Sequence, residues 1–292
     1  MTALAAPTPR SLAPAPEPKV AIRGISKAFR HADGRGFWAL HDVSLTVQSG
    51  EFICLAGPSG CGKSTILNIL SGLDAAFVGS AAIDGSAVGA TRDGRALCGY
   101  VFQEPRLLPW LTIERNLHFV LGAQRVSKPD QHARAAHWLD HVGLTRFRAS
   151  YPHQLSGGMQ QRASIARAFA SGHDLLLMDE PFSALDEMTA RAMRAELLQL
   201  WQRHNKTVIF VTHNLHEALY LANRVLLMTT GPGRIYREVA VDLPRPRQLD
   251  DPKLFELSRA VTQAFLHETG GGAAAARAAV LEPASETSKR ED

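Results

Sequence analysis

Residues Gly57–Thr65 read GPSGCGKST, and this stretch predicts the fold around it. It matches the pattern G-x-x-x-x-G-K-[ST] at every fixed position, with Gly57, Gly62, Lys63 and Ser64 in place. Glycines let successive backbone N–H groups converge on phosphate oxygens. The lysine brings a positive charge to the β- and γ-phosphates, and the serine hydroxyl is a ligand for Mg²⁺. The stretch therefore predicts a nucleotide site.

The flanking sequence supports this prediction. The apolar run FICLA (residues 52–56) predicts a buried strand, and STILNILSGL predicts a helix that ends near Gly72. That helix would point its N-terminus at the anion. A chance glycine-rich turn would not come with this strand-loop-helix order. We assign the whole loop to the nucleotide: Gly57, Pro58, Ser59, Gly60, Cys61, Gly62, Lys63, Ser64 and Thr65.

Composition narrows the class of protein. The chain has 292 residues and a net charge of +4, too mild an excess to indicate a nucleic-acid partner. Its three cysteines lack metal-ligand spacing and suit a reducing compartment. Cys61 is interpreted as a filler residue with an accessible thiol, not as a nucleophile.

The two ends of the chain differ from its middle. Residues 1–18 are rich in proline and alanine, without the apolar core of a signal peptide, and predict a disordered arm. Residues 248–268 predict one amphipathic helix, and residues 269–292 predict a tail without packed structure. No run approaches the roughly 18 apolar residues that span a bilayer. One folded domain is expected over residues 19–247.

Several stretches predict further elements. Alternating segments between Val20 and Val47 predict antiparallel strands, in which either Phe29 or Trp38 could stack on an adenine ring or simply pack at the edge. CGYVFQ, ending at Gln103, predicts a central strand. Two helical patterns follow. Between the strand and these helices, EPRLLPWL carries three apolar residues in a loop, for which we favour a docking surface over inward packing: Leu107, Leu108 and Trp110.

A second set of polar groups follows buried segments. LSGGMQQR (residues 155–162) places a serine and two glycines at the start of a helix, which predicts a second anion site. LLLMDE predicts a buried strand that ends in Asp179 and Glu180, at the edge where open α/β sheets bind ligands. Adjacent carboxylates could be a solvated surface pair. Here we assign Asp179 to Mg²⁺ and Glu180 to the attacking water.

One more strand, TVIFVTH, ends in His213. A histidine taken alone is more often structural. Because Gln103, Asp179 and His213 all follow strands, we expect these side chains to meet at one edge, near the phosphates.

Together these stretches resemble the ATP-binding subunit of ABC transporters over nearly all of residues 20–246. The resemblance implies an α/β fold: a P-loop NTPase core with a parallel sheet, an N-terminal antiparallel β subdomain and an inserted helical subdomain at about residues 104–172. It implies ATP and Mg²⁺ as cofactors. It also implies that Gln103 touches Mg²⁺ and the attacking water, that His213 is the switch histidine, and that Lys63, Gln103, Glu180 and His213 are catalytic.

The resemblance assigns the remaining nucleotide contacts. LSGGM is similar to the family signature, with Met159 in place of the commonest glutamine, and it implies contacts from Ser156, Gly157, Gly158 and Gln160. SALD (residues 183–186) resembles the loop between subunits. Phe29 lies where the family has its adenine-stacking aromatic residue, usually a tyrosine. The loop before Trp38 is longer than in many members.

A narrower likeness is to the nitrate, sulfonate and taurine import branch, carried by VFQEPRLLPWLTIERNL, YPHQLSGGMQQR and GPGRIYREVAVDLPRPR. Asn214 stands where that branch usually has aspartate, and the N-terminal arm is long. The likeness implies import, with integral membrane permease subunits, an indirect extracytoplasmic solute-binding protein and a place on the cytoplasmic face of the inner membrane. It does not identify the solute.

The family mechanism implies two copies packed head to tail around two ATP molecules, with the signature of one completing the site of the other. Two alternatives remain at this point. One is an ABC ATPase that acts on ribosomes or DNA, although such proteins carry two nucleotide units or a long coiled-coil insertion. The other is a regulatory module that binds ATP without hydrolysis, which Glu180 and His213 argue against.

Overall fold

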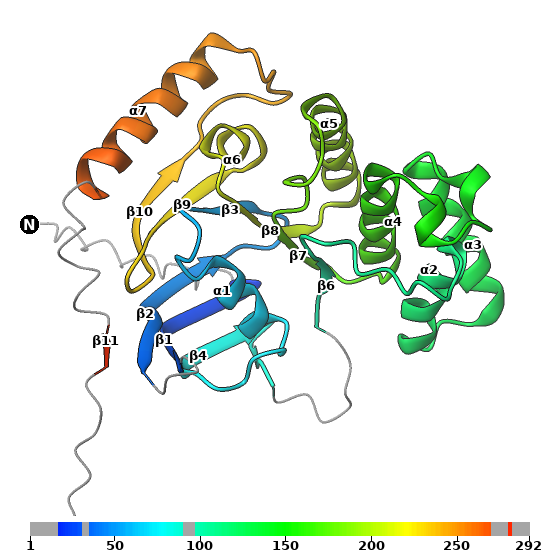
Figure 1. The fold of residues 1–292 in the computed structure, drawn as a ribbon, viewed down its shortest axis with the longest axis horizontal. Helices are drawn as coiled ribbons and strands as arrows, with labels where there is room; N and C mark the ends of the chain where they lie inside the picture. The colour runs from blue at the N-terminus through cyan, green and yellow to red at the C-terminus, as the bar shows by residue number, and fades with distance from the viewer. Residues whose placement is uncertain (1–16, 31–34, 90–96, 270–279, 282–292) are drawn as a thin grey trace, which may run out of the picture.

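The computed structural model describes residues 17–30, 35–89, 97–269 and 280–281, in which two sheets face each other (Figure 1). In the antiparallel sheet, β1 (Val20–Arg30) lies between β2 (Gly36–Val47) and β4 (Val78–Ile83). The short strands β5 (Ser86–Ala87) and β11 (Val280–Leu281) lie at its two edges. The antiparallel strands predicted from alternating residues are confirmed.

Strand β11 lies in the C-terminal segment that was expected to have no packed structure. Its two residues nevertheless pair with Gly36 and Phe37 of β2. The rest of that tail, residues 1–16 of the arm and residues 31–34 of the loop before Trp38 lie outside the described residues.

The second sheet is parallel except at one edge. Its order is β10-β9-β3-β8-β7-β6, and only β10 runs antiparallel to its neighbour. Strands β3 (Phe52–Ala56) and β8 (Thr207–Thr212) are buried at every residue, which explains their continuous apolar sequences. The remaining strands are β6 (Gly99–Val101), β7 (Leu175–Asp179), β9 (Arg224–Thr229) and β10 (Arg234–Ala240).

The two faces of the parallel sheet bury separate cores. On one face, Ile53 and Leu55 pack with α1 (Lys63–Leu70) and with the antiparallel sheet. On the other face, Phe52 packs among helices, with its ring centroid 5.6 Å from that of Trp201. The side chains of β3 therefore alternate between the two cores. The strand ends directly before the loop that begins at Gly57.

The prediction of a central strand at Cys98–Gln103 is wrong. Strand β6 lies at the edge of the sheet and pairs only with β7 among the described strands. Its apolar character reflects helix packing, because a Cβ built on Gly99 would lie 2.9 Å from the carbonyl oxygen of Ala168 in α4. A helix therefore approaches this strand closely.

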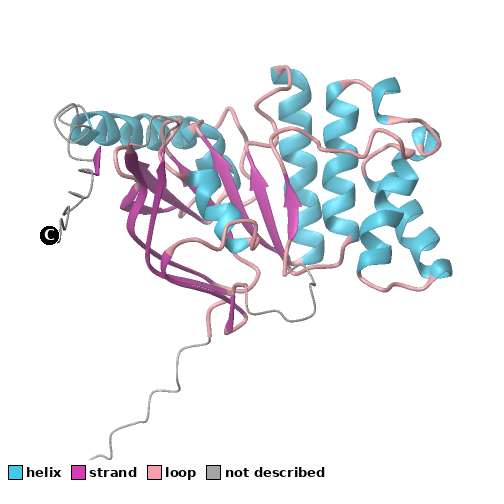
Figure 2. Ribbon diagram, turned by 60° about the horizontal axis from the view of Figure 1, so that its bottom comes forward, coloured by secondary structure: helices cyan, strands magenta, loops and turns pink. Residues whose placement is uncertain are grey.

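The helices other than α1 lie on the other face of the parallel sheet, and a group of them extends past its β6 edge (Figures 1 and 2). The two helical patterns predicted after Gln103 are α2 (Ile113–Ala123) and α3 (Lys128–His141), each capped at its N-terminus by a hydroxyl, of Thr112 and Ser127. Two 3₁₀ turns (Thr145–Phe147 and Pro152–Gln154) lead into α4 (Gly157–Ala170), and α5 (Glu187–His204) stands beside it.

Two helices complete the fold. Helix α6 (Leu215–Leu221) packs against the C-terminal helix α7 (Pro252–Thr269). Phe265 of α7 also contacts Tyr236 of β10, with 5.9 Å between ring centroids. No described helix combines the length and apolar character needed to cross a bilayer.

Candidate functional site

The phosphate loop connects the end of β3 to the start of α1. A Cβ at Gly57 would lie 2.5 Å from the carbonyl oxygen of Met228, and Gly62 has a φ of +90° with Leu40 in close contact. The close backbone oxygen at Gly57 and the positive φ at Gly62 therefore favour glycine at these two positions. Lys63 is buried, and its Nζ donates hydrogen bonds to the carbonyl oxygens of Gly57 at 2.8 Å and Pro58 at 3.0 Å.

The interpretation of Cys61 as an accessible thiol is wrong. The residue is fully buried, with its Sγ 3.8 Å from Nζ of Lys63. Burial raises the pKa of this thiol and outweighs the opposing charge of Lys63. Cys61 therefore fills space beneath the loop and presents only its backbone to a ligand.

An oxygen-rich pair lies where β7 ends. Ser64 Oγ donates a hydrogen bond to Asp179 Oδ1 at 3.0 Å. Burial raises the pKa of Asp179, and the hydrogen bond from Ser64 opposes this shift. A hydroxyl beside a carboxylate is the oxygen-donor chemistry that Mg²⁺ requires. These two residues therefore fit the metal role expected of them.

Glu180 adopts a backbone conformation that is rare for this residue type. Its φ is +42°, and its N–H donates to the carbonyl oxygen of Val211 at 3.0 Å. Such strain is tolerated where the surrounding structure fixes it, and it collects at functional sites. The carboxylate lies with Oε1 3.9 Å from Lys63 Nζ and Oε2 2.9 Å from His213 Nδ1.

Gln103 approaches this cluster from β6. Its Nε2 donates to Ser183 Oγ at 3.2 Å, and that hydroxyl donates to the carbonyl oxygen of Glu180 at 3.0 Å. The amide thus contacts the Glu180 segment, and its hydrogen bond is not to Ser64 or Asp179. Its assigned contact with Mg²⁺ remains a prediction.

These residues border a hollow of about 390 Å³ that runs from the phosphate loop to β1 and β2. Phe29 and Phe37 are among its lining residues, with their ring centroids 6.0 Å apart, and Phe29 is 37% exposed. Sequence reasoning named Phe29 but missed Phe37, which pairs with it across the two strands. Trp38, the other candidate, is not among the residues that line the hollow; its ring is 6.0 Å from His41.

The LSGGM stretch lies elsewhere. Ser156 caps α4 by accepting a hydrogen bond from the N–H of Met159 at 3.4 Å, and Gln160 donates to the carbonyl oxygen of Leu155 at 3.1 Å. A Cβ on Gly157 would meet open space, so its backbone is accessible. None of Ser156, Gly157, Gly158 and Gln160 borders the nucleotide hollow. A single chain therefore does not bring its two predicted anion sites together.

Comparison with known proteins identifies the family. Residues 40–183 match the model of the ABC transporter family. The chain is 46% identical over 235 residues to an aliphatic sulfonates import ATP-binding protein of Burkholderia cenocepacia, covering 80% of this chain and 84% of that one. It belongs to the ABC transporter family. A protein of the same name from Bacillus cereus is 40% identical over 254 residues, covering 86% of this chain and 97% of that one.

A solved ABC cassette has the same fold. The dimeric post-hydrolysis state of the ATP-binding cassette MJ0796, bound to ADP and phosphate, aligns with a TM-score of 0.68 at 32% identity and covers 77% of this chain and all of that one. The P-loop NTPase fold predicted from GPSGCGKST is confirmed. This chain is accordingly an ATP-binding subunit with an ATPase activity that is coupled to transport.

In this ABC transporter subunit, Asn214 is the N-cap residue of α6. Its side chain accepts a hydrogen bond from the N–H of Glu217 at 3.1 Å at the start of α6. Glu217 is buried and ion-paired with Arg194 at 2.7 Å, and it also accepts from Thr212 at 2.5 Å. This network fixes the turn that carries His213, so asparagine there preserves the local geometry.

Proposed function

We propose that two copies of this chain pair head to tail and together power a membrane importer. In this arrangement the signature of each copy closes over the nucleotide held by the other. The observation that supports it is the separation of the signature from the hollow lined by Lys63 and Glu180. The accessible backbone of Gly157 leaves that half of the site open to a partner, and the related MJ0796 cassette is a dimer.

Hydrolysis in this proposal depends on positioning and electrostatics. Lys63 leaves the loop carbonyls to neutralise the β- and γ-phosphates. Ser64 and Asp179 would hold Mg²⁺, which would neutralise charge on the phosphate oxygens. Glu180 orients and deprotonates the attacking water, and His213 fixes the carboxylate. Gln103 is linked to Glu180 through hydrogen bonds to Ser183. A movement of Glu180 during hydrolysis would therefore shift Gln103 and the edge strand β6.

The adenine end of the proposed site is aromatic. Phe29 and Phe37 offer ring surface to the hollow that also borders the phosphate loop. An adenine ring has the flat face that such side chains stack on. We propose that both rings contact the base.

A second hollow supports a membrane partner. It has a volume of about 370 Å³, is lined mainly by apolar side chains and lies between β6 and α2, with Leu108 and Phe119 on its wall. Trp110 nearby is 69% exposed, whereas Leu107 packs against the core. Of the three residues expected in a docking surface, Leu107 therefore packs inward instead. We propose that this hollow and Trp110 bind the permease subunits on the cytoplasmic face of the inner membrane.

The transported solute is proposed from the relatives. Both relatives described above are named for aliphatic sulfonate import, which favours an aliphatic sulfonate, the class that includes taurine, over nitrate. An extracytoplasmic solute-binding protein would deliver it. In such an arrangement the solute does not contact this chain. Its identity therefore has to be determined from the permease and the solute-binding protein.

Growth of a deletion strain tests the proposal. Cells without this chain should fail to grow with an aliphatic sulfonate as sole sulfur source and grow normally on sulfate. The wild-type chain should restore growth, and Glu180→Gln should not. Growth on taurine, and on nitrate as nitrogen source, separates the solutes. Unchanged growth under all these conditions would contradict an import role and favour a regulatory module.

A further inference from the structure

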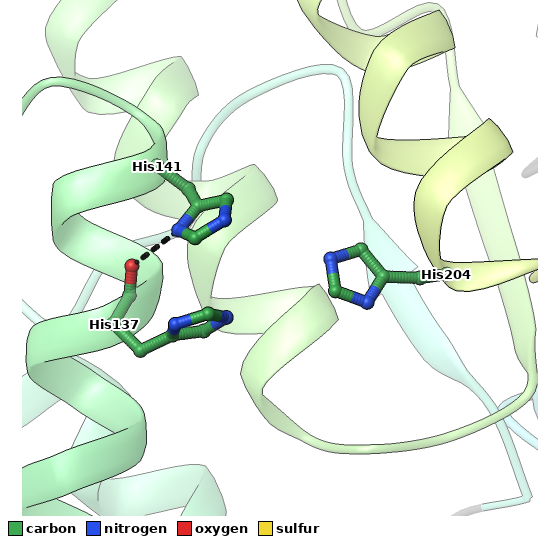
Figure 3. Close-up of side chains that lie close together, drawn as sticks. All are labelled: His137, His141 and His204. Atoms are coloured by element: carbon green, nitrogen blue, oxygen red, sulfur yellow. Dashed lines mark hydrogen bonds between the residues drawn. The ribbon is translucent and has the colours of Figure 1, made fainter.

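Three histidines gather far from the nucleotide hollow, where α3 meets the end of α5 (Figure 3). His137 and His141 lie one turn apart on α3, and His204 is the last residue of α5. Each offers a ring nitrogen, and these nitrogens all lie within 4.8 Å of one another. Figure 3 shows the ring of His204 pointing at the other two. No residue discussed above for ATP binding belongs to this cluster.

The rings are already prepared as ligands. Nδ1 of His141 lies 2.8 Å from the carbonyl oxygen of His137, which places the proton on Nδ1 and leaves Nε2 with a free lone pair. A ligating histidine usually donates its other N–H to a carbonyl in this way. Nε2 of His204 is buried and has no hydrogen-bond partner within the part of the chain that the structure describes. An unsatisfied buried nitrogen beside two other imidazoles indicates a missing ligand.

The cluster lies at the C-terminal ends of two helices. Both α3 and α5 end at the cluster, and helix C-termini carry partial negative charge.

We propose that His137, His141 and His204 bind one divalent transition-metal ion of the zinc class. Imidazole suits Zn²⁺, Cu²⁺ and Ni²⁺, whereas Mg²⁺ prefers oxygen ligands. Three nitrogens at about 2.0–2.1 Å from a tetrahedral ion are roughly 3.3 Å apart, so rotations that move each ring by about 1 Å would close the site. His137 is exposed, which leaves the fourth position to water. Trp138 and Phe169 cover the other side of His204 with aromatic surface.

The ion would cross-link two helices that are distant in sequence. It would hold α3 to the end of α5, and so fasten the helical region to the helices on the parallel sheet. Binding only to the folded chain stabilises the fold by linkage. A rise in melting temperature should therefore accompany metal binding.

Zinc titration tests this site. The chain, without a polyhistidine tag, is stripped with EDTA and titrated with ZnCl₂ by calorimetry in buffer free of nucleotide and Mg²⁺. We expect one Zn²⁺ per chain, a higher melting temperature with Zn²⁺, and the visible absorption of four-coordinate Co²⁺ when cobalt replaces zinc. His137→Gln, at an exposed position that does not threaten the fold, should weaken zinc binding tenfold or more and abolish the melting shift.

His132→Gln is the matched control, because His132 lies on the same helix and outside the cluster. It should bind zinc like the wild type. The proposal is overturned if the wild-type chain binds no zinc at micromolar concentration. It is also overturned if His137→Gln binds zinc unchanged, or if His132→Gln loses as much affinity as His137→Gln. None of these measurements depends on the proposed import role.

Discussion

Nδ1 of His213 lies 2.9 Å from Oε2 of Glu180, so the ring that follows β8 and the carboxylate that follows β7 form one unit. Strands β7 and β8 are adjacent in the parallel sheet, which brings their carboxyl ends together. The other carboxylate oxygen faces Lys63 at 3.9 Å. Glu180 is thus held between a ring and a cation, which orients it toward the phosphate loop.

Glu180→Gln should keep the shape of this unit and lose its charge. We expect ATP hydrolysis to fall by about 10²–10³-fold, as for removal of one preorganised electrostatic group, with ATP binding retained. Under the head-to-tail proposal the variant should be a monomer without nucleotide, a dimer with ATP and a monomer with ADP, measured by light scattering after size exclusion at high protein concentration. Tight ATP binding by a protein that stays monomeric throughout would argue against a shared site.

His213→Ala should act through Glu180. If the ring serves to orient the carboxylate, the double variant His213→Ala/Glu180→Gln should hydrolyse ATP no more slowly than the slower single variant, because residues acting as a unit are not additive. Steady-state phosphate release from the four proteins gives this cycle. Losses that multiply would show that the two side chains act independently.

Lys63→Ala should remove the charge at the phosphates and leave the backbone of the loop. ATP hydrolysis should be undetectable while weak nucleotide binding persists. A fluorescent ATP analogue measures the binding, and phosphate release measures turnover. Near-normal hydrolysis would mean that the site is elsewhere.

Trp110→Ala tests the docking surface against inward packing. Because Trp110 is 69% exposed, its truncation should leave thermal stability and basal hydrolysis little changed and remove stimulation by the permease subunits. Trp201→Ala is the control, since Trp201 is 8% exposed and truncating a buried tryptophan costs about 3–5 kcal/mol. Comparable destabilisation by both variants would identify Trp110 as a core residue.

Asp179→Asn should raise the stability of the nucleotide-free chain and at the same time remove a proposed Mg²⁺ ligand. Burial raises the pKa of Asp179 above its ordinary 3.8, so ionisation costs more in the folded chain and stability falls as the pH rises from 3.8 through the raised pKa. Without nucleotide or Mg²⁺, the variant should therefore melt at a higher temperature than the wild type at pH 7, and the difference should vanish in acid. Hydrolysis should be lost at every pH. A lower melting temperature at pH 7 would contradict this account.

Local sequence predicted most of the site because its residues follow strands. Asp179, Glu180 and His213 end or follow buried apolar runs, and parallel strands bring such ends to one edge. The edge position of β6 was not predictable from the sequence. A strand covered by a helix and a strand between two other strands can have the same apolar sequence. Burial of Cys61 depends on how the loop sits over α1, and Phe37 enters the site only through its register with Phe29.

The histidine cluster could be predicted only in part from the sequence. His137 and His141 are visible in the sequence as a pair one helical turn apart, but His204 joins them only through the packing of α5 on α3. No spacing rule connects positions so far apart.

The hydrogen bonds from Lys63 to the carbonyl groups of its own loop have a thermodynamic consequence. Before ATP binds, two carbonyl groups of the loop hold the buried ammonium group of Lys63. When ATP binds, phosphate oxygens replace these carbonyl groups as its partners. The charge of Lys63 is therefore removed from water when the chain folds, and nucleotide binding only exchanges one set of oxygen partners for another.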